Sequence, residues 1–287
     1  MIDKKVFICG TTRNSEQYVD AVFRTIQQIQ TLFLDSHIII SFDQSSDKTL
    51  LKLAQHKRIY GDKMDICLNR NPLSTRRTEN IANARNRILE KMRELMAKSG
   101  SAAEDPVPYF IMLDTDDVSA TEPDLDVIRR AIERSTEWDA ISFNRPGYYD
   151  IWALSIKPYI YSCWGWQDAQ SAVIITRNYI VKRLNELAPG QLLECQSAFG
   201  GFAIYKTDPF LKCAYDWRMP KQYMLTEDIK KNHKALGYCD SRSPLDQKTD
   251  EPDCEHRAFH MEAIAKYGAR VRISPECVFN APVLGHA

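Results

Sequence analysis

Hydrophobic residues in the first half of the chain follow two alternating patterns. One is a short, nearly continuous apolar run, which is typical of a strand buried on both faces. Such runs predict strands at Lys5–Cys9, His37–Phe42, Asp65–Leu68 and Tyr109–Leu113. The other pattern repeats at three- and four-residue steps and predicts amphipathic helices. We expect the first helix after Asn14, which can cap it together with Gln17, with an apolar face of Tyr18, Val22, Ile26, Ile29 and Phe33.

Two further helices complete this alternation. Asp47 can cap a helix after the second strand, and Thr78–Lys98 has apolar residues at helical spacing along its length. The Pro-containing stretch Ser99–Pro108 predicts a connection. The predicted fold class is therefore α/β, with a mostly parallel central sheet flanked by helices. Ligands of such sheets bind beyond the carboxyl ends of the strands.

The second half is less regular and predicts a smaller, mixed portion. We expect strands at Ala140–Phe143, Ala172–Thr176 and Gly201–Tyr205, and helices at Asn178–Leu187, Thr226–Leu236 and Glu255–Lys266. The sequence contains no internal repeat, low-complexity segment or convincing linker. Residues 1–287 are therefore expected to form a single domain.

Charge and composition exclude several classes of partner. The 38 basic and 38 acidic side chains cancel, so no overall field attracts nucleic acid or an anionic membrane. The apolar stretch near the amino terminus is far shorter than the roughly 20 residues of a transmembrane helix, and shorter than the core of a signal peptide. We therefore expect no transmembrane segment and a cytoplasmic protein. The eight cysteines stand singly, without a C-x-x-C pair, and predict buried free thiols, although disulfides stay open if the chain is secreted by another route.

Three carboxylates follow the apolar strand that ends at Leu113. Asp114, Asp116 and Asp117 would repel one another at the mouth of a buried strand unless a cation compensated them. Hard oxygen ligands suit Mg²⁺ or Mn²⁺, and such a metal would bridge to a diphosphate. The alternative is an acidic turn that caps the following helix without any metal.

The order of these motifs resembles that of GT-A glycosyltransferases. Asp114-Thr115-Asp116 is similar to the Asp-x-Asp motif of that family, and Asp43-Gln44-Ser45-Ser46-Asp47-Lys48-Thr49 is similar to its turn after the second strand. Ala84-Arg85-Asn86 resembles the family's Ala-Arg-Asn helix. Thr11, Thr12 and Arg13 follow the first strand, where these enzymes surround the nucleoside.

The resemblance implies a GT-A, Rossmann-like fold and a metal-dependent glycosyltransferase, with hexosyl transfer the expected reaction. Residues 1–118 would be the nucleotide-sugar-binding half and residues 119–287 the acceptor-binding half. The donor would be a UDP or GDP sugar, and the acceptor a hydroxyl of a glycan or other glycoconjugate. Mn²⁺ or Mg²⁺ on Asp114, Asp116 and Asp117 would stabilise the leaving diphosphate, with Asp116 taking part in catalysis. Donor contacts are expected from Thr11, Arg13, Asp43, Arg85 and Asp114; Arg76, Arg77 or Arg87 could contact phosphate in place of Arg85.

Two later segments would complete the site under the same resemblance. Gly200-Gly201 matches a strand entrance beside the donor sugar, where glycines permit close approach of a ligand. Glu255 is the candidate general base, and His256 the candidate third metal ligand, with His260 weaker. A simple tight turn, an acid at a helix start and packed histidines are the corresponding alternatives. The Glu-Asp base motif common in inverting members is missing at its usual place unless Glu227-Asp228 supplies it.

Aromatic residues gather in the predicted acceptor half. Flat rings could stack on sugars, although core packing is the favoured explanation for any single ring. The Tyr-Asp-x-Trp segment is also similar to fungal capsule mannosyltransferase-like proteins. The residues concerned are Tyr148, Tyr149, Trp152, Trp164 and Trp166.

Three other functions fit parts of the pattern. A haloacid-dehalogenase-like phosphatase also carries Asp-x-Asp at a strand end, but normally on its first strand. A sugar nucleotidyltransferase would explain Gly10-Thr11-Thr12-Arg13, although the expected Pro-Lys pattern is missing. A catalytically silent nucleotide-sugar-binding protein shares most of these residues with an active enzyme.

Overall fold

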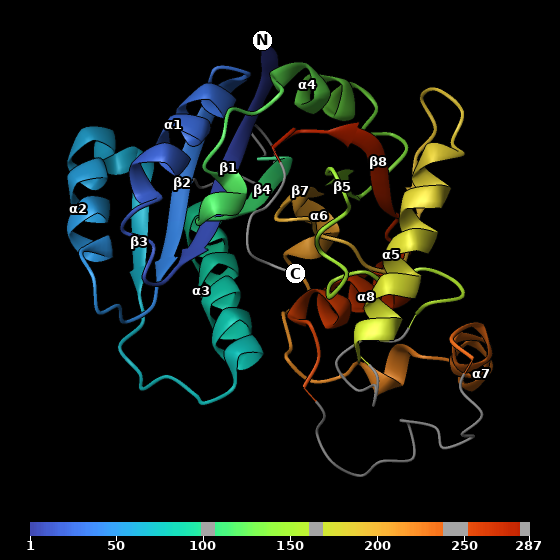
Figure 1. Ribbon diagram of the computed structural model, residues 1–287. Helices are drawn as coiled ribbons and strands as arrows, with labels where there is room; N and C mark the ends of the chain where they lie inside the picture. Colours follow the sequence, from blue (N-terminus) through green and yellow to red (C-terminus); the bar gives the residue numbers. More distant parts are fainter. Residues whose placement is uncertain (99–106, 161–168, 238–251, 282–287) are drawn as a thin grey trace.

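The computed structural model describes residues 1–98, 107–160, 169–237 and 252–281 (Figure 1). In this part of the chain the strands form one mixed sheet in the order β3-β2-β1-β4-β7-β5-β8-β6. The strands are β1 (Ile2–Thr12), β2 (Phe33–Phe42), β3 (Met64–Leu68), β4 (Tyr109–Asp114), β5 (Ala140–Asn144), β6 (Leu193–Glu194), β7 (Phe202–Lys206) and β8 (Val271–Cys277). The helices are α1 (Val19–Gln30), α2 (Thr49–Tyr60), α3 (Arg77–Lys98), α4 (Leu125–Glu133), α5 (Ala169–Asn185), α6 (Thr207–Phe210), α7 (Thr226–Ala235) and α8 (Glu255–Tyr267), with short 3₁₀ turns at Gly61–Lys63, Asp117–Ser119 and Lys221–Tyr223.

Strand β1 lies in the middle of the parallel part of the sheet. It pairs in parallel with β2 on one side and β4 on the other, so that Cys9 is opposite both Ile39 and Met112. Strand β7 runs antiparallel between β4 and β5, and β8 continues in parallel beyond β5. The predicted α/β class with a mostly parallel sheet is therefore confirmed, and β7 makes the sheet mixed.

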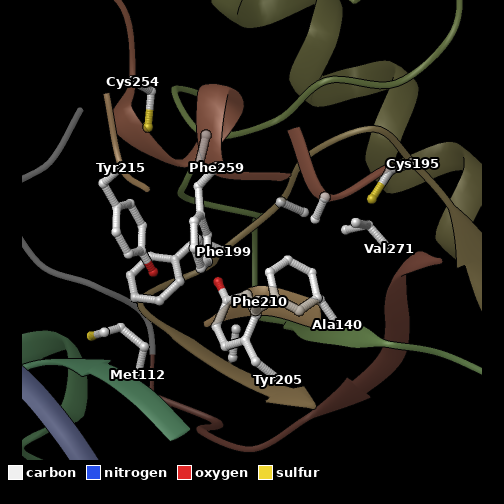
Figure 2. Close-up of a cluster of buried hydrophobic side chains, with 14 of the residues drawn as sticks. Met112, Ala140, Cys195, Phe199, Tyr205, Phe210, Tyr215, Cys254, Phe259 and Val271 are labelled. Atoms are coloured by element: carbon white, nitrogen blue, oxygen red, sulfur yellow. The ribbon is translucent and has the colours of Figure 1, made fainter. Parts of the chain in front are cut away.

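Both faces of the sheet are covered, as continuous apolar strands require. Successive side chains of β4 alternate between two cores: Phe110 and Met112 pack with residues of α3 and α8, whereas Ile111 and Leu113 pack with residues of α1 and α4. Figure 2 shows part of the first core, in which Met112 lies below a group of aromatic rings. Burial of each such side chain contributes about 1.5–3 kcal/mol to folding.

The start of the first helix was predicted wrongly. Helix α1 begins at Val19 after Tyr18, without a side-chain cap. Asn14 instead lies in the preceding loop at a φ of 50°, and its side-chain oxygen accepts a hydrogen bond of 2.8 Å from the backbone N–H of Ser46. This hydrogen bond joins the two loops. Asparagine suits the position because it tolerates the left-handed conformation. Phe33, assigned to the helix face, begins β2.

The predicted strand Ala172–Thr176 is also wrong, because these residues lie inside helix α5. Val173, Ile174, Ile175 and Thr176 are β-branched and locally favour a strand. Packing overrides this preference: Ala172, Ile180 and Leu184 are all buried in the core that contains α3. The predicted helix Asn178–Leu187 is thus the second part of α5.

Helix α4 and strand β8 have no counterpart in the sequence prediction, and neither do the short elements β6 and α6. Helix α4 begins after Asp124, whose carboxylate accepts hydrogen bonds from the N–H groups of Asp126 and Val127. Strand β8 pairs with β5 and carries the edge strand β6. The remaining predicted elements agree with the structure to within a few residues.

The residues that the structure describes test several other expectations only in part. One sheet takes strands from both sides of residue 118, and the division into a donor half and an acceptor half stays a prediction. Cys163, Cys239, Trp164 and Trp166 lie outside the described residues. The cysteines that the structure describes are free thiols, and burial raises the pKa of Cys67 to about 11. No helix in the described ranges has the length and apolarity to span a bilayer.

Candidate functional site

A cavity of about 750 Å³ lies beyond the carboxyl ends of β1, β2 and β4. The chain passes from β1 to β2 and β3 on one side, then returns through α3 to place β4 on the other side of β1. The order of the strands therefore reverses between β1 and β4. Crevices of this kind, at a reversal point of an open α/β sheet, are where such sheets bind ligands.

Most of the predicted site residues line this cavity. They are Thr11, Arg13, Asp43, Arg85, Asp114, Asp116, Glu255 and His256. Asp117, Gly200 and Gly201 are not among the described lining residues. The cavity is also lined by the segment from Ser74 to Arg85, by Tyr149, Asp150 and Trp152, and by Phe199 and Cys254. The structure thus brings together residues from three strand ends, one helix N-terminus and the second half of the chain.

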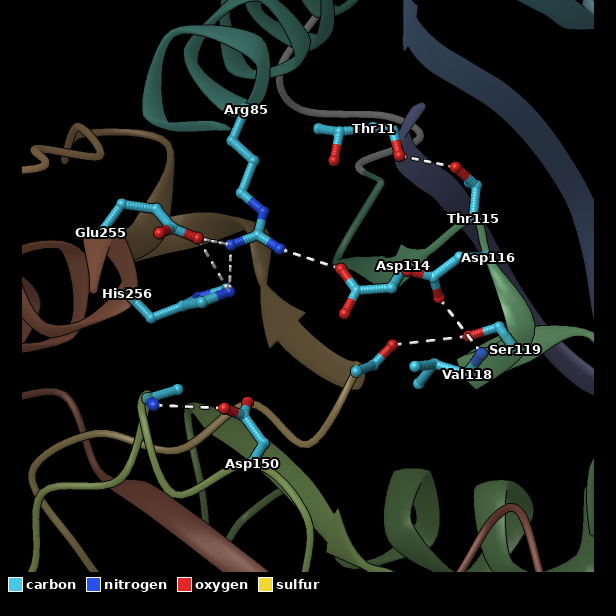
Figure 3. A network of polar contacts seen from close by, with 12 residues as sticks. Thr11, Arg85, Asp114, Thr115, Asp116, Val118, Ser119, Asp150, Glu255 and His256 are labelled. Atoms are coloured by element: carbon cyan, nitrogen blue, oxygen red, sulfur yellow. Dashed lines mark hydrogen bonds and ion pairs between the residues drawn. The ribbon is translucent and has the colours of Figure 1, made fainter. Parts of the chain in front are cut away.

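Arg85 connects acids from both halves of the chain (Figure 3). Arg85 is 3% exposed, and its guanidinium forms ion pairs with Glu255, at the start of α8, and with Asp114, at 3.1 Å. The rings of Phe199 and Tyr215 lie 4.7 and 5.7 Å from the guanidinium carbon. Arg85 was predicted to contact the donor; its observed partners are protein carboxylates. This guanidinium therefore positions Asp114 and Glu255.

His256 is a neutral imidazole held by the same arginine. Burial lowers its pKa well below the usual value, and the charge of Arg85 lowers it further. Its Nε2 faces Nη1 of Arg85, which can only donate, so Nε2 accepts and Nδ1 carries the proton. Nδ1 is buried and has no hydrogen-bond partner among the described residues. The nitrogen lone pair that a metal would need is therefore engaged by Arg85.

Asp114 is the acid at the centre of the cavity wall. Burial raises its pKa, while the positive charges of Arg85 and Arg77 oppose that shift. Its Oδ1 accepts from Arg85, and its Oδ2 accepts a hydrogen bond of 3.4 Å from the hydroxyl of Tyr149. Tyr149 was singled out from the sequence only as one of a group of aromatic rings. Its hydroxyl now links the loop after β5 to the acidic cluster.

Asp116 and Asp117 differ in their placement. Asp116 lines the cavity, and its Oδ1 accepts a hydrogen bond of 3.1 Å from the N–H of Val118. Asp117 begins the 3₁₀ turn Asp117–Ser119. The alternative interpretation of the acidic cluster is an acidic turn that caps a following helix. Asp116 does cap this 3₁₀ turn, and it also lines the cavity.

The donor set facing the cavity fits a divalent cation that is shared with a diphosphate. Among the described residues no group of three or more His, Cys, Asp or Glu side chains is arranged to hold a metal. Mg²⁺ and related ions are commonly held by one or two carboxylates, with phosphate oxygens and waters as the other ligands. Asp114 and Asp116 provide that pair of carboxylates.

Cationic groups face the same space. Arg77 lines the cavity at the start of α3, is exposed, and forms no ion pair with the residues that the structure describes. The N-terminus of a 22-residue helix adds partial positive charge at this point. Arg76 instead lies over the ring of Trp217, and Arg87 pairs with Asp43. Of the basic residues weighed beside Arg85, Arg77 is the one that reaches the cavity.

Asp43 lies at the end of β2 and is 6% exposed. Arg87 forms an ion pair with its Oδ1 and donates a hydrogen bond of 3.1 Å to the hydroxyl of Ser41. The following turn is tied to the β1 loop, because Asp47 accepts a hydrogen bond of 3.0 Å from the N–H of Glu16. The ends of β1 and β2 are thereby fixed to each other beside the cavity.

The glycine pair at the start of β7 allows close packing within the protein. Gly201 has a φ of 77°, and an added Cβ would lie 2.2 Å from Cγ1 of Val118 and 3.5 Å from Oδ2 of Asp114. Gly200 has a φ of 68° and donates its N–H to Asp150 at 3.0 Å. These glycines let β7 approach the acidic loop, and their contact with a ligand stays a prediction.

Asp150 is a cavity residue that the sequence did not single out as a site residue. Burial raises its pKa to about 6, despite a hydrogen bond from the N–H of Gly200, and the negative charge of Asp114 adds to the rise. In the sequence, the Tyr-Asp-x-Trp segment stands out for its aromatic rings. The acid within this segment is Asp150, and its presence there is the one sequence feature that could have indicated a site residue.

No protein-family model matches this chain, and no curated protein sequence matches it. Solved structures with some similarity include the 1–349 fragment of TarS from S. aureus, at 15% identity and a TM-score of 0.42 over 94% of this chain and 57% of that one. Another is the mannosyltransferase PcManGT from Pyrobaculum calidifontis, in complex with GDP-Man and Mn²⁺, at 13% identity and a TM-score of 0.45 over 100% and 59% of the two chains.

A third is glucosyl-3-phosphoglycerate synthase from Mycobacterium tuberculosis, in complex with Mn²⁺, UDP and phosphoglyceric acid. It has 9% identity and a TM-score of 0.47 over 97% of this chain and 72% of that one. The chain spans less than two thirds of the length of the TarS structures and of PcManGT.

Proposed function

We propose that this chain is a GT-A glycosyltransferase that moves a sugar, expected to be a hexose, from a UDP or GDP sugar to a hydroxyl of a carbohydrate or glycoconjugate. The observation that supports this most directly is the composition of the cavity at the strand reversal between β1 and β4. Two carboxylates, Asp114 and Asp116, face the same space as Arg77 and the N-terminus of α3. This combination suits a diphosphate bound together with a divalent cation.

The walls formed by the ends of β1, β2 and β4 and by the start of α3 would bind the donor. Thr11, Arg13 and Asp43, at the ends of β1 and β2, would contact the nucleoside, where the Asp43 carboxylate can accept from a base N–H or ribose hydroxyls. Arg77 would contact the diphosphate. Asp114 and Asp116 would hold Mn²⁺ or Mg²⁺, which supplies Lewis-acid stabilisation of the leaving diphosphate. Asp117 and His256 were proposed as further ligands, and His256 would first have to exchange its contact with Arg85.

The second half of the chain would supply the acceptor side. Trp152 lines the cavity and offers a flat ring to a sugar face. A carboxylate on this side must take the proton of the attacking hydroxyl. The sequence favours Glu255 for that role, and the cavity offers Asp150 as well.

Binding of nucleotide with metal tests the proposal. We expect isothermal titration calorimetry with UDP and GDP in the presence of MnCl₂ to show binding by the wild-type protein. Asp116→Asn should weaken that binding at least tenfold, because it removes a negatively charged ligand of the cation. Asp126→Asn is the matched control: this aspartate is exposed on helix α4 and is not among the residues that line the cavity, and we expect less than a threefold change.

A second assay separates the rival functions. Mn²⁺-dependent release of nucleoside diphosphate from UDP-glucose or GDP-mannose supports a transferase, in which water replaces the acceptor. Release of inorganic phosphate from phosphoesters would favour the phosphatase. Metal-dependent nucleotide binding with neither release would favour the catalytically silent binding protein.

A further inference from the structure

Asp150 lies in the loop between β5 and α5 and lines the same cavity as Asp114 and Glu255 (Figure 3). Two backbone N–H groups hold its carboxylate: that of Ala153 donates to Oδ1 at 3.2 Å, and that of Gly200 donates to Oδ2 at 3.0 Å. The carboxylate is therefore fixed in orientation. Each of its oxygens keeps lone-pair capacity beyond these hydrogen bonds.

Glu255 is in a different electrostatic situation. It is 4% exposed and forms an ion pair with Arg85, which is itself almost fully buried. The carboxylate of Glu255 is thus engaged by a buried guanidinium that also holds Asp114. Asp150 forms no ion pair with the described residues, and its carboxylate is held by backbone N–H groups alone.

We propose that Asp150, and not Glu255, is the general base of this site, and that Glu255 is a positioning residue that keeps Arg85 and Asp114 in place. The inference rests on the proposed glycosyl transfer and names the group that receives the proton. Trp152, two residues along the chain, lines the same cavity, and an acceptor sugar stacked on its ring would lie beside this carboxylate.

The proposed reaction is a single displacement. The acceptor hydroxyl oxygen forms a bond to the anomeric carbon of the donor sugar, and the bond from that carbon to the diphosphate oxygen breaks. The bonding electron pair leaves with the nucleoside diphosphate. The hydroxyl proton passes to Asp150 and then to solvent, which regenerates the carboxylate. The configuration at the anomeric carbon is inverted.

The charged and titratable groups that face Asp150 support its ability to accept a proton. Burial and the negative charges of Asp114, on β4, and Glu255, on α8, raise its pKa to about 6, against the two backbone N–H groups. Cys254 on the α8 side and the adjacent Tyr148 and Tyr149 also face Asp150, and burial raises the pKa of each. Asp150 is therefore ionised at neutral pH and more basic than an ordinary aspartate.

The test uses Mn²⁺-dependent release of nucleoside diphosphate from UDP-glucose or GDP-mannose, with water as the acceptor. For the wild type, we expect kcat/KM to fall as the pH drops below about 6, as Asp150 takes up a proton. Asp150→Asn should slow the release about a hundredfold or more and remove this acid limb. Its affinity for UDP or GDP with Mn²⁺ should change less than threefold. Asp150→Ala should regain part of its rate when sodium formate supplies a carboxylate.

Glu255→Gln is the matched comparison, and we expect it to keep the acid limb. The inference is overturned if the limb disappears in Glu255→Gln, or if Asp150→Asn loses rate but retains the limb. Should the Asp150 variants fail to fold, the profiles of the wild type and Glu255→Gln still decide between the two acids. If the wild type neither binds nucleotide nor releases diphosphate, the proposed function itself fails, and the inference falls with it.

Discussion

Removal of the Arg85 side-chain charge is the most direct test of how the site is held together. In Arg85→Met the side chain keeps much of its length but loses the guanidinium that joins Asp114 to Glu255. Two carboxylates would then remain in the cavity wall without their shared counterion. Because Glu255 is 4% exposed, water cannot easily replace the missing charge.

The size of the effect follows from this burial. Breaking a buried ion pair by removing one partner costs about 3–5 kcal/mol of stability. Here one arginine serves two acids, which favours the upper part of that range. The Asp114 side chain is 22% exposed and can regain some hydration, which favours the lower part. We therefore expect a loss of about 4 kcal/mol at pH 7, or roughly 10 °C in the unfolding temperature of a domain of this size.

Urea unfolding followed by circular dichroism measures this loss. The control is Arg134→Met, which removes an arginine from an exposed pair with Glu137 and should cost at most about 1 kcal/mol. The double variant with Glu255→Gln should be less destabilised than the sum of the two single variants, because the second change removes an orphaned charge. Equal losses for Arg85→Met and Arg134→Met, or strict additivity with Glu255→Gln, would refute the buried network.

Two further predictions concern stability. Gly201→Ala should destabilise the protein by about 3 kcal/mol, because the new Cβ would overlap Val118 and the residue has a positive φ. Gly190→Ala, at a φ of 80° in open space, is the control and should cost about 1 kcal/mol. Equal costs of the two substitutions in urea unfolding would exclude the steric overlap. Asp139→Asn should cost about 2 kcal/mol at pH 6 and progressively less below pH 4. Burial opposes ionisation of Asp139, but hydrogen bonds from Arg270 and Lys206 lower its pKa to about 2. The contribution of Asp139 to stability is therefore present above the unfolded-state pKa and is lost as the pH falls toward 2. An unchanged cost of the substitution at pH 3 would contradict this reasoning.

The sequence predicted the parallel part of the sheet well because each strand there is buried on both faces. Runs such as Phe110–Leu113 need no knowledge of their neighbours to be recognised. Ala172–Thr176 failed for the opposite reason. Its β-branched residues favour a strand locally, and only the burial of Ile180 and Leu184 by other elements makes the segment helical.

The candidate site shows the same limit of local information. Asp114 and Asp116 could be found because they follow a recognisable strand, and strand ends meet at one edge of the sheet. The partners of Arg85 could not be found, because Glu255 is 170 positions away and reaches Arg85 only through the packing of α8. Asp150 was overlooked for a related reason: its raised pKa depends on burial, which a sequence motif does not display.

Strand β7 has a consequence for the order in which the molecule can fold. It fills the place beside β4, yet it is synthesised about ninety residues later. Until Phe202–Lys206 leave the ribosome, the nascent chain presents the hydrogen-bonding edge of an apolar strand, Tyr109–Leu113, with nothing paired to it. An open edge of this kind invites pairing with other chains. The growing polypeptide can therefore aggregate through this edge between these two points of its synthesis, and chaperone capture would be useful there.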